Sequence, residues 1–251
     1  MSLTRALDSV HQEISGFVLA GGGSSRLGQD KVLLPWNGRT LLQHAVYRLE
    51  RVCGTVAVCA SRDDLRQCLP PSVAIIRDAV AGAGPLGGIV PALERSPTDW
   101  NLFLAVDLPL VPIELLRMLA AQSENDGILA EKIFCVLPQM DGMSHPLCGL
   151  YHRSLAPGMR SALEEGKYKI MLATQEAISA MAADLKSPPD SMREFQEDQA
   201  RAQSNSRIRF LDMQSLTMPL EFGDKLGAPD WFLNINTPSD LQRALDVSLK
   251  V

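Results

Sequence analysis

A glycine-rich loop with a lysine at its far end follows the first apolar run of the chain. Residues 19–31 read LAGGGSSRLGQDK, so three glycines (Gly21–Gly23) come before two cations, Arg26 and Lys31. Backbone without Cβ atoms can approach a ligand closely, and successive N–H groups form concavities that bind anions. A flexible strand-to-helix connection is the simpler interpretation, but three consecutive glycines make such a connection entropically costly. The loop is therefore predicted to wrap a nucleotide, with the two cations on its phosphates.

Two familiar phosphate-binding loops do not fit this stretch. A P-loop needs glycine directly before its lysine and Ser or Thr directly after it. Here Asp30 precedes Lys31 and Val32 follows it. The dinucleotide fingerprint G-x-G-x-x-G needs a third glycine at the place that Arg26 occupies. These mismatches argue against a P-loop NTPase and against a Rossmann dehydrogenase.

Asp107 is a second candidate because it ends the apolar run NLFLAV (101–106). An unpaired carboxylate at a partly buried strand end is costly, and carboxylate oxygens are preferred ligands of Mg²⁺. The alternative is an aspartate that hydrogen-bonds its own turn before Pro109. We favour the metal, and we expect Asn234 and Asn236 to face Asp107 across a crevice as amide oxygens for a second metal position.

Short apolar runs alternate with helical patterns in the first half of the chain. Continuous apolar runs are typical of strands buried on both faces of a parallel sheet. They occur at 16–20, 55–60, 73–77 and 101–106, and helical patterns occur at 40–52, 63–69, 86–96 and 112–122. The alternation predicts an α/β fold, a doubly wound, mostly parallel Rossmann-like sheet with helices on both faces. Ligands bind such sheets beyond the carboxyl ends of the strands, which is where the glycine loop and Asp107 fall.

The second half of the chain is less regular. We expect a strand at 145–152, a helix at 155–166, and a strand, a turn and a closing helix over 231–245, with Thr237 as the N-cap of that helix. We predict a single domain over 15–251, preceded by an N-terminal extension (1–14) and containing a polar insertion at 184–207.

Composition narrows the classes of function. The chain has 251 residues and a formal net charge of −5, which does not suit a non-specific nucleic-acid binder. The first residues lack the apolar core of a signal peptide, and no run is long enough to span a bilayer. The five cysteines show no C-x-x-C spacing and the four histidines no zinc-ligand spacing. We expect reduced, buried thiols in a cytoplasmic protein, with neither nucleic acid nor membrane as a partner.

The stretch LAGGGSSRLGQDKVLL (19–34) resembles the signature loop of nucleotidyltransferases that activate small molecules with an NTP. Its Leu-Ala-Gly-Gly form is most similar to the molybdenum cofactor guanylyltransferases (MobA), whereas cytidylyltransferase relatives usually carry Leu-Ala-Ala-Gly. Three further segments resemble the same family in the expected order: GPLGG (84–88), DLPLV (107–111) and NINTPSDL (234–241). The resemblance spans 17–245 apart from the polar insertion.

This resemblance implies a nucleotidyltransferase that moves GMP from GTP to the phosphate of the molybdopterin cofactor and releases pyrophosphate. It implies Mg²⁺ as cofactor, contacts with cofactor-biosynthesis proteins or molybdoenzymes as partners, and Lys31, Arg26 and Asp107 as catalytic residues. Besides Lys31 and Asp107, the implied nucleotide-binding residues are Leu19, Ala20, Gly21, Gly22, Gly23, Ser24, Cys59, Asp78, Gly84, Pro85 and Leu86.

Several of these implied residues have structural alternatives. Asp78 at a strand end is equally a turn former, and 84–88 is also a helix start with Pro85 in its first turn. The resemblance places His145 and Pro146 near the acceptor, but a partly buried structural histidine explains the same pattern. Cys59 stands where guanylyl enzymes often carry Asn. A sister enzyme that uses CTP or a sugar-phosphate acceptor therefore stays open, as does a non-catalytic GTP-binding protein.

Overall fold

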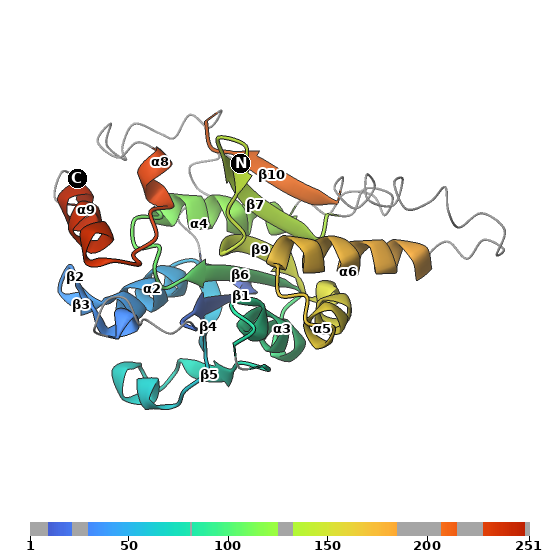
Figure 1. Ribbon diagram of the computed structural model, residues 1–251, viewed down its shortest axis with the longest axis horizontal. Coiled ribbons are helices and arrows are strands. Elements are labelled where there is room, and N and C mark those ends of the chain that lie inside the picture. The colour runs from blue at the N-terminus through green and yellow to red at the C-terminus, as the bar shows by residue number, and fades with distance from the viewer. Residues whose placement is uncertain are drawn as a thin grey trace.

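One mixed sheet organises the chain, and its strands run in the order β10-β7-β9-β6-β1-β4-β5, with β8 paired to β7 (Figure 1). The structure is a computed structural model that describes residues 10–21, 30–80, 82–124, 133–184, 207–214 and 228–248. The strands of the sheet are β1 (His11–Leu19), β4 (Cys53–Ala60), β5 (Ala74–Arg77), β6 (Trp100–Ala105), β7 (Cys135–Met140), β8 (Met143–Ser144), β9 (Cys148–His152) and β10 (Ile208–Asp212). A separate two-stranded ribbon is formed by β2 (Pro35–Trp36) and β3 (Arg39–Thr40).

Most neighbouring strands are parallel, as predicted. The pairs β1–β4, β1–β6, β4–β5 and β7–β10 are parallel, whereas β9 runs antiparallel to both β6 and β7. The first strand begins at His11, which pairs with Cys53 of β4. Residues 11–14, predicted to belong to an N-terminal extension, are therefore part of the sheet. Residues 1–9 lie outside the described part.

Helices cover both faces of the sheet, as predicted. The α-helices are α2 (Leu41–Glu50), α3 (Leu86–Arg95), α4 (Ile113–Ala120), α5 (Ala156–Glu164), α6 (Ile170–Asp184), α8 (Ala228–Trp231) and α9 (Pro238–Ser248). Short 3₁₀ turns are η1 (Lys31–Leu33), η2 (Asp64–Cys68), η3 (Ala121–Glu124) and η5 (Arg153–Leu155). Successive strand residues point to opposite faces. A Cβ at Gly16 of β1 would meet Leu49 of α2 at 3.2 Å, whereas one at Gly88 of α3 would lie 3.6 Å from Leu19. The helices α2 and α3 therefore lie on opposite faces of the sheet.

The core consists of the apolar strand residues and the inner faces of these helices. Phe17 of β1 and Phe103 of β6 stack at the centre of the sheet, with ring centroids 5.2 Å apart. All five cysteines are free thiols; four are buried, and Cys68 is half-buried. Within the described residues, no helix is long and apolar enough to cross a membrane.

The C-terminal region differs from the expectation. The strand predicted near residues 231–235 is not formed: Trp231 ends α8, and irregular backbone follows until α9 begins at Pro238. Phe232 and Ile235 are nevertheless buried. Their apolar side chains gave the segment the pattern of a strand, but its backbone joins no sheet. The polar insertion predicted at 184–207 falls almost wholly outside the described residues.

Candidate functional site

Lys31 and Asp107 meet beyond the carboxyl ends of the central strands. The Lys31 Nζ donates to Asp107 Oδ2 at 2.6 Å and to Asn236 Oδ1 at 2.8 Å. The two charged side chains keep only 14% and 16% of their surface exposed. An ion pair so little hydrated interacts more strongly than one on an open surface. The structure thus places side by side Lys31 and Asp107, two residues that the sequence analysis assigned to one site.

The register of the sheet explains how residues 76 positions apart come together. Leu19 at the end of β1 pairs with Ala105 at the end of β6, and the Val106 N–H donates to the Leu19 carbonyl at 3.1 Å. The two following loops therefore start side by side. Lys31 opens η1, whose N-cap is Asp30. Arg62 forms an ion pair with this Asp30 carboxylate, which holds the far end of the glycine loop against the end of β4.

Asn236 reaches the site on the segment before α9. The Ile235 N–H donates to the Asp107 carbonyl at 3.1 Å, which fixes this segment to the D-x-P turn. As predicted, Thr237 caps α9: its Oγ1 accepts from Asp240 N, while Asp240 Oδ2 accepts from the backbone of Asn236 and Thr237. Within the described part of the chain, Asn234 is exposed and does not join the hydrogen bonds around Lys31. The structure thus brings one of the two predicted asparagines to Asp107.

The Asp107 carboxylate has an oxygen available to coordinate a cation. Its Oδ1 is buried and has no partner among the described residues, whereas Oδ2 accepts from Lys31. An unpaired carboxylate oxygen is costly to bury. Asp107 and the amide oxygen of Asn236 are hard oxygen donors of the kind that Mg²⁺ prefers. No group of three or more His, Cys, Asp or Glu suited to a metal occurs in the described ranges. Asp107 and Asn236 would supply two protein ligands, and Mg²⁺ usually takes its remaining ligands from water and substrate phosphates.

Asp78 lines the same sheet edge beside the start of the glycine loop. A Cβ at Gly21 would lie 3.2 Å from Asp78 Oδ2, and one at Gly88 would lie 3.2 Å from Asp78 Oδ1. Larger residues at either glycine would crowd this carboxylate. Partial burial raises the pKa of Asp78 above its ordinary value. Cys59, by contrast, is only 1% exposed, and burial raises the pKa of its thiol. The Ala20 N–H donates to the backbone carbonyl of Cys59 at 2.9 Å.

The segment 84–88 forms the start of α3. Gly84 adopts φ +61°, a conformation that favours glycine, and its carbonyl accepts from Gly87 N at 3.1 Å. Pro85 is exposed and is the N-cap residue rather than part of the first turn. Leu86 is wholly buried in the core. Gly84 and Pro85 are thus the accessible members of this predicted nucleotide-binding segment.

His145 contacts the same C-terminal segment that carries Asn236. Its ring stacks on Phe232, with centroids 3.7 Å apart and planes within 8° of parallel. Its Nε2 is buried without a partner among the described residues, and burial lowers the pKa of the imidazole. The carbonyl of Pro146 accepts from Tyr151 Oη at 2.8 Å. Phe232 was not a sequence-based candidate because its position in an apolar run resembled that of a core strand residue.

The remaining loop candidates, Gly22, Gly23, Ser24 and Arg26, lie outside the described residues.

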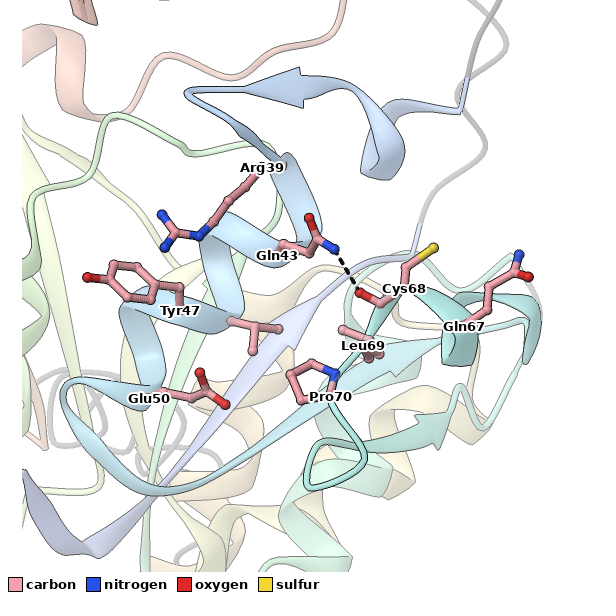
Figure 2. A pocket seen from close by; sticks show the side chains of 9 residues that line it. Arg39, Gln43, Tyr47, Glu50, Gln67, Cys68, Leu69 and Pro70 are labelled. Atoms are coloured by element: carbon pink, nitrogen blue, oxygen red, sulfur yellow. Dashed lines mark hydrogen bonds between the residues drawn. The ribbon is translucent and has the colours of Figure 1, made fainter.

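A cavity of 490 Å³ lies away from the Lys31–Asp107 site, between the outer side of α2 and residues 67–70 (Figure 2). Arg39, Tyr47, Glu50 and Leu69 are among its lining residues, and it includes none of the described site candidates. Guanidinium groups of Arg39 and Arg51 lie 4.1 and 5.7 Å from the Tyr47 ring centre.

The sequence analysis missed two arginines that contact the loops carrying Lys31 and Asp107. Arg62 was not among the sequence-based candidates, yet it pairs with Asp30 next to Lys31. Arg48 was not singled out, although a signal was present. It follows Leu41 and Ala45 at helical spacing, so it falls on the buried face of α2.

Comparisons with known proteins identify the family. Residues 16–179 match the model of the MobA-like NTP transferase domain. A probable molybdenum cofactor guanylyltransferase of Carboxydothermus hydrogenoformans is 28% identical over 242 residues, which are 95% of this chain and 99% of that protein. A molybdenum cofactor guanylyltransferase of Serratia proteamaculans is 32% identical over 166 residues, 65% of this chain and 80% of that protein.

A solved structure shows the same fold. The molybdopterin-guanine dinucleotide biosynthesis protein A of Archaeoglobus fulgidus superimposes with a TM-score of 0.65 at 22% identity, covering 94% of this chain and 100% of that one. Together with the site geometry, the family match shows that this chain belongs to the MobA-like NTP transferase family of nucleotidyltransferases.

Proposed function

We propose that the chain transfers GMP from GTP to the phosphate of the molybdopterin cofactor in a Mg²⁺-dependent reaction. The observation that carries the proposal is the 2.6 Å contact between Lys31 Nζ and Asp107 Oδ2 at the carboxyl ends of β1 and β6. It joins a cation suited to phosphate and a carboxylate suited to a metal in one place. The guanylyltransferase names of the relatives from C. hydrogenoformans and S. proteamaculans support the choice of substrates.

The chain's own residues would act mainly by position and charge. The Lys31 ammonium has three hydrogens, two of which face Asp107 and Asn236. The third is available to a phosphate oxygen of the nucleotide. We propose that Asp107, through its unpartnered Oδ1, and Asn236 hold Mg²⁺. The bound ion would neutralise charge on the triphosphate. The glycine loop with Arg26 would surround the phosphates, Asp78 and the start of α3 would face the nucleoside, and His145 with Pro146 would border the acceptor.

The transfer needs no covalent enzyme intermediate. An oxygen of the acceptor phosphate attacks the α-phosphorus of GTP, and a new P–O bond forms. The bond between the α-phosphorus and the oxygen that bridges to the β-phosphate breaks, and pyrophosphate leaves with that electron pair. A phosphate monoester is already ionised near neutral pH, so the attacking oxygen does not require a general base. Positioning and electrostatic stabilisation are then the protein's main contributions.

The test is a nucleotide screen with purified molybdopterin cofactor and Mg²⁺, which measures pyrophosphate release for ATP, CTP, GTP and UTP. We expect release with GTP alone, dependence on the acceptor, and a dinucleotide product in the mass spectrum. Release with CTP but not GTP would instead identify the sister cytidylyl enzyme. Tight GTP binding without pyrophosphate release under any of these conditions would identify a non-catalytic binding protein.

The free thiols fit a reducing compartment, and we propose that the protein is located in the cytoplasm.

A further inference from the structure

Arg48 of α2 is a buried cation whose hydrogen bonds go to the backbone of the D-x-P turn. Only 5% of the residue is exposed. Its Nη1 donates to the carbonyls of Leu108 at 3.2 Å and Pro109 at 3.0 Å, and its Nη2 donates to the carbonyl of Val111. One guanidinium therefore holds three carbonyls of the turn that begins at Asp107.

A second residue of α2 supports the same turn. His44 Nε2 lies 3.2 Å from the Pro109 carbonyl. Because a carbonyl only accepts hydrogen bonds, Nε2 carries the hydrogen. Burial and the nearby Arg48 lower the pKa of His44 to about 4, so the ring is neutral at pH 7. From the opposite side, the Ile235 N–H donates to the carbonyl of Asp107.

We infer that Arg48 is a positioning residue that fixes the D-x-P turn so that the Asp107 carboxylate faces Lys31. The inference rests on the proposed function for the role of Asp107 as a metal ligand. Burying a guanidinium is costly, and an apolar side chain of similar volume often fills such a place without loss of stability. The fork of Arg48 instead matches several carbonyls at once. Its target is the turn that carries the candidate metal ligand.

The consequence of losing Arg48 follows from this arrangement. Without the guanidinium, three buried carbonyls lose donors, and the turn gains freedom to move. The Asp107 carboxylate would then spend less time in the orientation that pairs with Lys31 and accepts a cation. Weakened metal binding, rather than weakened contact with the nucleotide base, is the expected result.

The test compares Arg48→Gln and Arg48→Lys with wild type and with Arg51→Gln. Arg51 is a matched control because it is the C-cap residue of the same helix, is exposed, and donates to Tyr47 Oη rather than to the turn. Hydrogen–deuterium exchange of residues 106–112 reports the turn directly. The affinity for Mn²⁺ in the presence of GTP, measured by electron paramagnetic resonance, reports the metal site. Both readouts are independent of turnover.

For Arg48→Gln we expect at least tenfold faster exchange in the turn and at least tenfold weaker Mn²⁺ binding, with GTP affinity in the absence of metal within threefold of wild type. Arg48→Lys keeps the charge but not the forked guanidinium, so its exchange rate and Mn²⁺ affinity should fall between those of Arg48→Gln and wild type. If Arg48→Gln does not fold, Arg48→Lys takes its place in the test. Arg51→Gln should match wild type. Unchanged exchange, or faster exchange with unchanged Mn²⁺ affinity, overturns the inference.

Asp107→Asn, measured alongside, separates this inference from the proposed function. If Asp107→Asn loses Mn²⁺ binding while the folded Arg48 variant keeps it, Arg48 is not a positioning residue and the metal role of Asp107 stands. If Asp107→Asn itself keeps full Mn²⁺ affinity, the metal role in the proposed function is wrong.

Discussion

The Lys31 ammonium lies 2.6 Å from the Asp107 carboxylate, although the two residues come from different strand ends of the sheet. Each side chain is mostly shielded from solvent. The two side chains thus neutralise each other, and in the proposed function both act on the same triphosphate. If Lys31 keeps this contact while its third hydrogen serves a phosphate oxygen, as proposed, each side chain depends on the other for its orientation, so the two residues should act as one unit.

Lys31→Ala should reduce pyrophosphate release by about 10²–10³-fold, because loss of one preorganised donor to developing charge typically costs that much. The far-UV circular dichroism should not change, since Lys31 lies in a short 3₁₀ turn at the rim of the site. Lys169→Ala is the matched control because Lys169 is exposed on the segment before α6. Activity of Lys31→Ala within a few-fold of wild type would show that the role given to Lys31 is wrong.

Asn236→Ala should lower kcat/KM for GTP by about tenfold, since it removes the amide oxygen that accepts a hydrogen bond from Lys31. Asn234→Ala should have no measurable effect, because Asn234, although as exposed as Asn236, makes no hydrogen bond to Lys31 among the described residues. Steady-state assays of pyrophosphate release compare the same Asn-to-Ala change at two positions that are two residues apart. Equal losses of kcat/KM in both variants would show that Asn236 has no specific role in the site.

Asp78→Asn should stabilise the protein at pH 8 and lose this advantage as the pH falls. Burial raises the pKa of Asp78 in the folded chain above its value in the unfolded chain. Between these two pKa values the folded state binds more protons, so wild-type stability rises as pH decreases through the folded pKa. The difference in Tm between Asp78→Asn and wild type should therefore shrink from pH 8 to pH 4.5. Asp99→Asn, at an exposed position, supplies the control. A gain that is equal at both pH values would contradict burial as the cause.

Much of the fold could be predicted from sequence because the apolar runs are continuous and are separated by clear helical patterns. The runs near 55–60, 73–77 and 101–106 all correspond to strands of the sheet. The helix cap at Thr237 could also be predicted, because Thr stands at the N-cap, Pro at the first helical position and an acidic residue at the third. Strand direction could not be predicted: β9 is as fully buried as the parallel strand β6, so its antiparallel pairing left no mark in the sequence pattern.

The site divides in the same way. Glycines, a terminal lysine and an aspartate after an apolar run are local signals, and Lys31 and Asp107 were found from them. Arg48, His44 and Phe232 act through contacts 60 or more residues away in sequence or through stacking across the fold. Such partners depend on how α2 and the C-terminal segment pack against the sheet, which no local pattern records.

A double-mutant cycle on kcat/KM for pyrophosphate release tests most directly whether Lys31 and Asp107 serve the same triphosphate. The four proteins are wild type, Lys31→Ala, Asp107→Asn and the double variant, with Asp99→Asn combined with Lys31→Ala as the uncoupled control. We predict that the double variant loses little more activity than the weaker single variant, because residues that act as a unit are strongly non-additive. Losses that simply multiply, as in the Asp99 control, would contradict the account.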